Sequence, residues 1–189
     1  MIAYPHGHEP DFWSPDPEER KHRFALGNTS RASVADPPLI AICMNPSYAN
    51  HSEADKTVNR LIRASIDNAQ PGWVMLNLYP ERATDASKLL DYDAGLSAAN
   101  CAAIEQVLGQ YGVTEVLVAW GGLKHKTLRS AKTDVLAMFD RLGVKPYTFD
   151  GLTTGGDPFH PTPRGPALLM KGTKRYLARS GSRLVELVP

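Results

Sequence analysis

The sequence predicts an α/β fold built around a mostly parallel sheet. Short apolar runs alternate along the chain with longer segments whose apolar residues recur at helical spacing. Strands that alternate with helices form right-handed crossovers, which place helices on both faces of a parallel sheet. The chain has 189 residues, of which 42% are hydrophobic and 22% are charged, so one domain is expected. We therefore expect residues 1–189 to form a three-layer α/β/α sandwich with four or five mostly parallel strands.

The first 38 residues are rich in Pro, His, Asp and Glu and show little periodicity. We expect an irregular N-terminal arm over residues 1–38, with a short helix near residues 18–26. Pro37 and Pro38 mark the start of the core, which is predicted to cover residues 39–189. No basic segment followed by an apolar run opens the sequence, so we expect no signal peptide.

Four short runs predict strands, and the first of them, residues 39–44, is continuously apolar, which suits a strand buried on both faces as in a parallel sheet. The first run stops at Asn45-Pro46, where a ladder of hydrogen bonds cannot continue, and the third is closed by Gly121-Gly122. The four predicted strands are residues 39–44, 73–79, 116–120 and 146–149. A further strand at the edge of the sheet is predicted over residues 183–188.

The segments between these strands carry apolar residues at helical spacing. In the longest of them Leu128, Val135 and Phe139 share one face, and Gly143 follows the end. The predicted helices are residues 55–69, 85–90, 95–110, 124–142 and 167–178. A polar loop rich in Gly and Pro precedes the last of them.

Polar residues follow the predicted strands, and ligands bind beyond the carboxyl ends of parallel strands. Asn45 directly follows the first strand, Asn77 lies near the end of the second, and His160 lies in the loop after the fourth. An amide can orient a water or read the edge of a nucleobase, and an imidazole can donate a hydrogen bond. Each residue also has a structural interpretation. Asn45 could cap a turn, Asn77 could bridge buried groups, and His160 could belong to a surface turn.

Missing motifs exclude several classes of site. The sequence has no GxxxxGK[ST] phosphate loop, no GxGxxG after a strand, no GxSxG elbow and no HExxH pair. Its two cysteines, Cys43 and Cys101, form no CxxC pair, which argues against an iron–sulfur or cysteine–zinc site. We expect buried free thiols in a reducing cytoplasm, and neither a metal nor a cofactor.

The net charge of +1 hides an asymmetry along the chain. Residues 1–120 contain nine Lys and Arg against 15 Asp and Glu, whereas residues 121–189 contain 12 against five. Such a polarised chain can present one basic face to a polyanion, although solvated helices give the same count. No apolar run approaches the length of a membrane span, so no membrane partner is expected.

Four short motifs lie at the ends of the predicted strands. They are Met44-Asn45-Pro46-Ser47, Val74-Met75-Leu76-Asn77, Val116-Leu117-Val118-Ala119-Trp120-Gly121 and His160-Pro161-Thr162-Pro163. In this order and at comparable spacing, they resemble the motifs of the uracil-DNA glycosylase superfamily, above all its mismatch-specific branch. The resemblance covers about residues 39–166 and implies a uracil-DNA-glycosylase-like sandwich.

A longer resemblance rests on the same Met-Asn-Pro-Ser motif and on two further segments. Asp55, Thr57, Val58 and Arg60 fit the pattern Asp-x-Thr-Val-x-Arg, and residues 77–85 fit Asn-Leu-x-x-x-Arg-Ala-Thr-Asp. Together these segments resemble an uncharacterised family of bacterial and phage proteins. This second resemblance implies no activity.

The glycosylase resemblance implies hydrolysis of the N-glycosidic bond of a pyrimidine flipped out of DNA, which leaves an abasic site and needs no cofactor. Asn45 would position the attacking water, His160 would donate to a carbonyl oxygen of the base, and Asn77 would read its Watson–Crick edge. The best-known branch has an Asp where this chain has Asn45. An amide cannot act as a base, so Asp55 is a candidate to assist catalysis.

The residue after Pro46 bears on which bases would fit. The best-known branch has a Tyr there that blocks substituents at the 5-position of the pyrimidine, whereas this chain has Ser47, with Tyr48 one place later. The resemblance therefore implies a 5-substituted pyrimidine, such as the modified bases of some phage genomes, and a role in defence against phage. Tyr79 and Phe159 could stack on the base.

DNA is the expected partner, and the chain is expected to act as a monomer. The predicted contacts with DNA are Gly121, Gly122, Lys124, Lys126, Arg82, Arg164, Lys171 and Lys174. Two alternatives stay open. The near-neutral charge fits a hydrolase or transferase that acts on free modified nucleotides or nucleosides. A non-catalytic nucleic-acid-binding protein would keep its affinity but never release a base.

Overall fold

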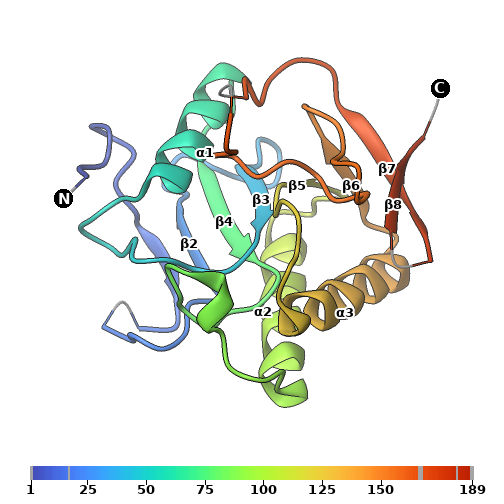
Figure 1. Cartoon of the computed structure of the whole chain (residues 1–189). Coiled ribbons are helices and arrows are strands. Elements are labelled where there is room, and N and C mark those ends of the chain that lie inside the picture. Colours follow the sequence, from blue (N-terminus) through green and yellow to red (C-terminus); the bar gives the residue numbers. More distant parts are fainter. Residues whose placement is uncertain (1, 17, 166–167, 182, 188–189) are drawn as a thin grey trace.

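One sheet of eight strands organises the part of the chain that the computed structural model describes, residues 2–16, 18–165, 168–181 and 183–187 (Figure 1). The strand order is β1-β2-β4-β3-β5-β6-β7-β8. The strands are β1 (Phe12–Ser14), β2 (Ala25–Asn28), β3 (Leu39–Cys43), β4 (Trp73–Asn77), β5 (Glu115–Val118), β6 (Lys145–Thr148), β7 (Arg175–Ser180) and β8 (Arg183–Glu186). The helices are α1 (Lys56–Asp67), α2 (Ala94–Gln110) and α3 (Lys126–Leu142), with a short 3₁₀ helix η1 at Ala86–Lys88.

Strands β4, β3, β5 and β6 run parallel in the middle of this sheet. Antiparallel strands extend it at both edges, so four of the seven neighbouring pairs are antiparallel. The predicted α/β class is confirmed. The prediction of four or five mostly parallel strands is wrong, because it missed β1, β2 and β7.

The side chains of the central strands alternate between the two faces of the sheet. In β3, Ile40 and Ile42 pack with residues of α2 and α3, whereas Leu39, Ala41 and Cys43 pack with residues of α1. Helices therefore cover both faces, with α1 on one side and α2 and α3 on the other, as Figure 1 shows. Continuous burial of β3 explains why its sequence is an uninterrupted apolar run.

The helices begin and end at residues that suit those positions. Asp55 caps α1 by accepting the backbone N–H of Val58 at 2.8 Å, and Gly143 follows α3 with a φ of 68°. The predicted helices at residues 55–69, 95–110 and 124–142 are thus confirmed as α1, α2 and α3. The helix predicted at residues 85–90 shrinks to the 3₁₀ helix η1. No helix in the described ranges has the length and apolar character that a bilayer crossing requires.

The predicted irregular arm with a helix near residues 18–26 is wrong. The segment Ala25–Asn28 is β2, which pairs with β4, and β1 then pairs with β2. A Cβ on Gly27 would lie 2.5 Å from the carbonyl oxygen of Trp73, so only glycine allows this close approach. The conformation of this short segment is therefore set by its pairing with β4 and not by a local pattern.

The predicted helix at residues 167–178 is also wrong wherever the structure describes it. Residues 168–174 form a loop in which Gly172 has a φ of 101°, and β7 follows. The edge strand predicted at residues 183–188 is confirmed for the length of β8. Residues 167 and 188 of these two predictions lie outside the described residues.

Candidate functional site

A cavity of about 380 Å³ opens at the carboxyl ends of β3 and β4, on the face of the sheet that α1 covers. Residues from β3, β4, the start of α1 and the loops after β3, β4 and β6 line it. Five residues that were predicted from the sequence are among them: Asn45, Ser47, Tyr48, Asp55 and His160. The structure therefore brings together all three predicted catalytic residues.

Hydrogen bonds between loops assemble the cavity. The backbone N–H of Ala83 donates to the carbonyl oxygen of Pro46 at 2.8 Å, and Nδ2 of Asn45 donates to the carbonyl oxygen of Ala83 at 2.8 Å. The loop after β6 lies against the end of β5, because the N–H of Gly121 donates to the carbonyl oxygen of Pro158 at 2.8 Å. These loops therefore lie together at the carboxyl rim of the sheet.

The side chain of Asn45 uses its amide nitrogen to hold the loops together. Nδ2 donates to the carbonyl oxygens of Ala83 and Pro46, at 2.8 Å and 3.1 Å. Among the described residues none donates to Oδ1. That oxygen can accept only, so it can hold a water through the water's O–H and leave the water's lone pairs for attack. Asn45 therefore combines the predicted capping role with an acceptor for a ligand.

The ring of His160 is held in one tautomer. Nδ1 accepts the backbone N–H of Thr162 at 3.2 Å, and the Thr162 hydroxyl oxygen lies 3.0 Å from the same atom. The proton of the neutral ring is therefore on Nε2. Burial lowers the pKa of His160 below its ordinary value of 6.5, while the charge of Asp55 raises it by less. At neutral pH the ring is an uncharged donor through Nε2.

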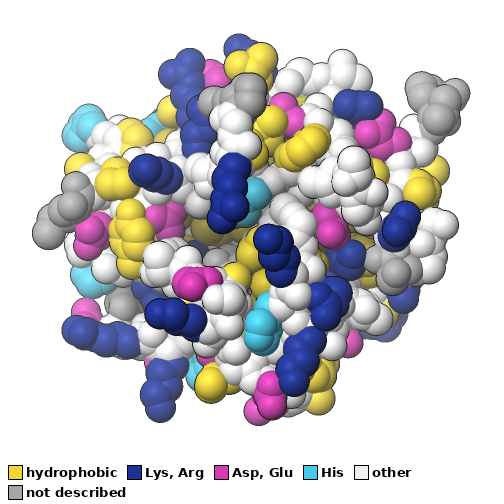
Figure 2. Space-filling model, in the orientation of Figure 1, with side chains coloured by type: hydrophobic (Ala, Val, Ile, Leu, Met, Phe, Trp, Pro, Cys, Tyr) yellow, Lys and Arg dark blue, Asp and Glu magenta, His cyan; other side chains and the backbone are white. Residues whose placement is uncertain are grey.

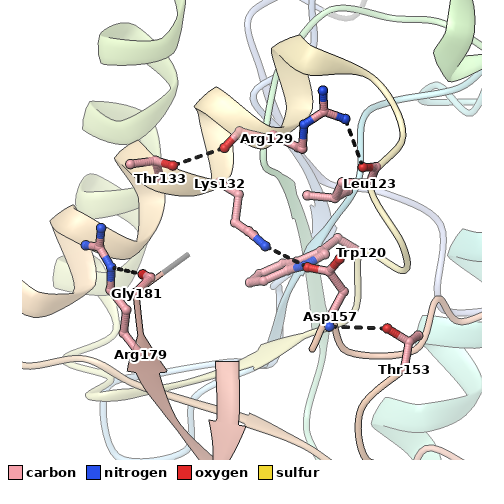
Figure 3. Close-up of polar contacts among 9 residues, drawn as sticks. All are labelled: Trp120, Leu123, Arg129, Lys132, Thr133, Thr153, Asp157, Arg179 and Gly181. Atoms are coloured by element: carbon pink, nitrogen blue, oxygen red, sulfur yellow. Dashed lines mark hydrogen bonds and ion pairs between the residues drawn. The ribbon is translucent and has the colours of Figure 1, made fainter. Parts of the chain in front are cut away.

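A buried ion pair anchors the loop that carries His160. Lys132 of α3 places its Nζ 2.9 Å from Oδ1 of Asp157, and Nε1–H of Trp120 donates to the same oxygen at 3.1 Å. Figure 3 shows Lys132 reaching from α3 to Asp157, with the Trp120 ring alongside. Inside the loop, the N–H of Asp157 donates to Oγ1 of Thr153 at 3.2 Å (Figure 3). These contacts fix the backbone three residues before His160.

Gly121 lets the His160 loop approach the end of β5. Its φ is 74°, and a Cβ on this residue would lie 2.9 Å from the Cβ of His160. Gly121 is buried behind the loop, whereas Gly122 is exposed. The structure thus gives Gly121 a packing role toward His160 that the sequence did not suggest.

Asp55 has 5% of its surface exposed and serves both α1 and the cavity. Oδ1 is committed to the helix cap, through the N–H of Val58. The second carboxylate oxygen, Oδ2, is not used by the helix cap and is the one that remains to accept a hydrogen bond in the cavity. The Asp55 charge also acts on His160, where it opposes the larger effect of burial on the pKa of the ring.

Asn77 lies behind the cavity wall and does not line it. It is fully buried at the end of β4, beside Cys43 in the strand register, and on the same face as Met75. Both Cys43 and Met75 line the cavity. Neither Nδ2 nor Oδ1 of Asn77 has a hydrogen-bond partner among the described residues, so the expected internal bridge is not formed. A buried polar group without a hydrogen bond costs about 1–3 kcal/mol in stability, so the Asn77 amide would gain from a hydrogen-bond partner.

Ser47 and Tyr48 lie in the cavity wall with different surroundings. Oγ of Ser47 donates to Oγ1 of Thr84 at 3.3 Å. The Tyr48 side chain is 42% exposed, and the cavity persists beside it. The cavity therefore stays open beside the small Ser47 and the partly exposed Tyr48.

Tyr79 and Phe159, the two predicted stacking residues, do not line the cavity. Tyr79 is buried on the face of α2 and α3, where its ring centroid lies 6.3 Å from that of Tyr92. Its hydroxyl oxygen accepts the N–H of Asp93 at 3.1 Å. Phe159 is half-buried next to His160 in the chain. Tyr79 is therefore a packing residue of the core.

Among the eight predicted DNA contacts, the side chains of three have partners within the protein. Arg82 donates to two backbone carbonyl oxygens of the loop after β3. Lys126 pairs with Asp91 at 2.9 Å, and Lys174 pairs with Glu115 at 2.6 Å. Glu115 begins β5, so the Lys174 ammonium lies at the opposite end of the sheet from the cavity. The structure therefore does not gather these three side chains around one ligand path.

The other predicted basic contacts, Lys124, Arg164 and Lys171, are exposed. On the face shown in Figure 2, Lys and Arg side chains are spread out, with Asp and Glu side chains between them. A dispersed positive charge of this kind provides weaker attraction for a polyanion than a continuous basic stripe.

Arg23 is a buried charged residue of the cavity that sequence reasoning missed. It lies two residues before β2 and is 4% exposed, and its side chain lines the cavity. No pattern around it signals a site, since the segment was expected to form an irregular arm. Its position became apparent only through the pairing of β2 with β4.

The cavity offers acceptors and donors to a small polar ligand. Oδ1 of Asn45 accepts, Nε2–H of His160 donates, and the guanidinium of Arg23 donates. Its volume lies in the range of small-molecule pockets. Among the described residues, no three His, Cys, Asp or Glu side chains are grouped so that they could hold a metal ion.

The chain matches the family described as "Protein of unknown function (DUF1643)" over residues 23–162. This range begins at Arg23 and ends at Thr162, and every residue that lines the cavity falls inside it. No curated protein and no solved structure matches the chain.

Proposed function

The chain belongs to the DUF1643 family, and we propose that it is a monofunctional DNA glycosylase that hydrolyses the N-glycosidic bond of a modified pyrimidine and leaves an abasic site. The observation that carries this proposal is that one cavity contains both a free hydrogen-bond acceptor and a free hydrogen-bond donor. Oδ1 of Asn45 is left as an acceptor, and Nε2–H of His160 is left as a donor. The motifs that resemble the uracil-DNA glycosylase superfamily supply these two residues.

Hydrolysis of this bond needs a donor for the base and an acceptor for the water. As the bond between C1′ and the base nitrogen lengthens, positive charge grows on the sugar and negative charge grows on the base. Nε2–H of His160 would donate to the base carbonyl oxygen, and Oδ1 of Asn45 would hold the water against C1′. The water oxygen bonds to C1′, the electron pair of the broken bond leaves with the base, and a proton from the water completes the freed base.

Asp55 supports this reaction through its charge. Its Oδ1 holds the start of α1, which leaves the second oxygen toward the cavity. A carboxylate there stabilises the positive charge on the sugar and can take the proton of the water. Asp55 would thus supply the basicity that the Asn45 amide lacks.

The cavity favours a pyrimidine with a substituent at its 5-position. Ser47 is small, and Tyr48 lies in the cavity wall with 42% of its surface exposed, so the cavity stays open beside both residues. Modified bases of phage DNA have such substituents, which is why we extend the proposal to a role in defence against phage. A flipped base would enter the cavity from the carboxyl rim of the sheet.

We assign the core to a uracil-DNA-glycosylase-like sandwich. The parallel strands β4-β3-β5-β6, with α1 on one face and α2 and α3 on the other, support this assignment. The antiparallel strands at the two edges would then be additions to that core. Cys43 and Cys101 are free thiols, which fits a reducing cytoplasm.

A second candidate function is hydrolysis of the same bond in free modified nucleosides or nucleotides. The dispersed basic side chains and the internal partners of Arg82, Lys126 and Lys174 favour it. Salt separates the two functions. An enzyme that binds DNA through several phosphates loses affinity steeply as salt rises, whereas one that binds a nucleoside does not.

Base release tests the proposal. The protein is incubated with unmodified DNA, uracil-containing DNA, phage DNA with modified pyrimidines and the matching free nucleosides, and freed bases are identified by mass. We expect release from one substrate class, lost in Asn45→Ala and in His160→Ala and retained in the surface variant His6→Ala. Binding without release from any substrate would contradict the proposal and point to a non-catalytic binding protein.

A further inference from the structure

Arg23 is a buried cation in the wall of the cavity. NH1 donates to the carbonyl oxygen of Ala49 at 2.8 Å, and NH2 donates to Sδ of Met75 at 3.4 Å. A thioether sulfur is a weak acceptor, and Nε has no partner among the described residues. The guanidinium therefore keeps unused donor capacity at the cavity.

Arg23 has one carboxylate, that of Asp55, among the groups that act on it most. Arg82 and Asp55 are the charged residues that act on it, and they act in opposite directions. The neighbouring Tyr4 and Cys43 are uncharged at neutral pH, because burial raises the pKa of both groups far above 7. Asp55 also acts on Arg82, as does Glu19, so Arg23 shares its carboxylate with a second guanidinium. A buried charge without full compensation is costly, and an anionic ligand group relieves that cost.

Asn77 provides an independent observation on the same side of the cavity. It belongs to the face of β4 that also presents Met75, the residue that contacts Arg23. Both polar atoms of its side chain are buried without a partner among the described residues. Two unsatisfied polar side chains beside one cavity indicate a binding site for an oxygen-rich group rather than a packed core.

We propose that Arg23 forms an anion-binding subsite of the cavity. The inference rests on the proposed function for the rest of the ligand, a pyrimidine nucleoside. The anion is either a carboxylate at the 5-position of the base or the phosphate of the nucleotide, both of which match the planar fork of a guanidinium. The bound oxygen would take the place of the Met75 sulfur at NH2 and supply an acceptor for Nε.

Isothermal titration calorimetry with three ligands tests the subsite. The ligands are 2′-deoxyuridine, 5-carboxy-2′-deoxyuridine and 2′-deoxyuridine 5′-monophosphate. We expect the protein to bind one of the two anionic ligands roughly tenfold to 100-fold more tightly than 2′-deoxyuridine. Preference for the carboxylated base places the anion on the pyrimidine ring, and preference for the monophosphate places it on the sugar.

Matched variants assign the preference to Arg23. Arg23→Met should remove it, and Arg23→Lys should retain part of it, because the charge stays but the fork is lost. Arg63→Met is the control, since Arg63 lies on the surface of α1 and pairs with Asp67. The ratio of affinities within each variant is the measured quantity, so a general loss of stability does not imitate the result.

Equal binding of all three ligands, no binding of any, or an unchanged preference in Arg23→Met would overturn the subsite. The test is independent of catalysis. A preference that depends on Arg23, together with no base release from any substrate, would keep the subsite and refute the glycosylase. Base release without a preference for an anionic ligand would keep the glycosylase and refute the subsite.

Discussion

Gly121 and His160 pack so closely that a Cβ on residue 121 would lie 2.9 Å from the Cβ of His160. The contact links the end of β5 to the loop after β6, and so sets where the imidazole enters the cavity. The position of His160 therefore depends on a residue that has no side chain.

Gly121→Ala should impair both stability and base release. Alanine at a φ of 74° is strained, and its methyl group would push the His160 loop away. We expect a loss of about 1–3 kcal/mol in the free energy of unfolding, measured by urea denaturation. Gly109→Ala is the control, because Gly109 lies in α2 with open space around it and should tolerate alanine. Equal stability of the two variants would contradict the packing role of Gly121.

Lys132→Met should leave the carboxylate of Asp157 buried without a positively charged partner. Removal of one partner from a buried ion pair costs about 3–5 kcal/mol, which denaturant unfolding would detect. The double variant Lys132→Met/Asp157→Asn removes both charges and keeps an acceptor for Trp120. It should be clearly more stable than the single variant. A double variant that is as unstable as the single one would show that charge is not the cause.

The pH dependence of base release should follow the neutral form of His160. Burial lowers the pKa of this ring below 6.5, so the rate should stay constant through neutral pH and fall only when the pH drops below the lowered pKa. The same shift means that the unfolded chain takes up the proton first, so this group destabilises the fold as the pH falls below 6.5. His160→Gln keeps a neutral donor and should lose this step in the pH–rate profile. A step at or above pH 7 that survives in His160→Gln would assign the titration to another group.

Two substitutions separate the roles of Asp55. Asn is an equally good helix cap, so Asp55→Asn keeps the cap of α1 but removes the carboxylate that acts on the buried Arg23 guanidinium, and it should lower the rate of base release. Asp55→Ala should cost about 1 kcal/mol more in the free energy of unfolding than Asp55→Asn, because it also removes the cap. Unchanged release in Asp55→Asn would limit this residue to the cap.

The central strands and helices could be predicted because their burial follows regular periods. Leu39–Cys43 is apolar throughout since helices cover both of its faces, and α3 shows its stripe in Leu128, Val135 and Phe139. The strands at the edges could not be predicted in this way. Ala25–Asn28 and Arg175–Ser180 are strands because β4 and β6 offer them free edges, which no local pattern reveals.

The site was predictable to the extent that it follows from strand ends. Asn45 and His160 come directly after parallel strands or in the loops beyond them, so topology alone brings them together. Tyr79 also follows a strand. Its side chain no longer follows the alternation between the two faces of the sheet, because β4 ends at Asn77, and its ring packs on the face that α2 and α3 cover. Arg23 reaches the cavity from the unpredicted β2, which explains why it was missed.

The central claim is that Asn45 and His160 act on one substrate in one cavity. The most direct measurement is the single-turnover rate of base release, taken with substrate fully bound, for the wild type, Asn45→Ala, His160→Ala and the double variant. The account predicts that each single variant loses roughly 100-fold or more and that the double variant loses less than the product of the two. Wild-type release rates in either single variant would contradict it.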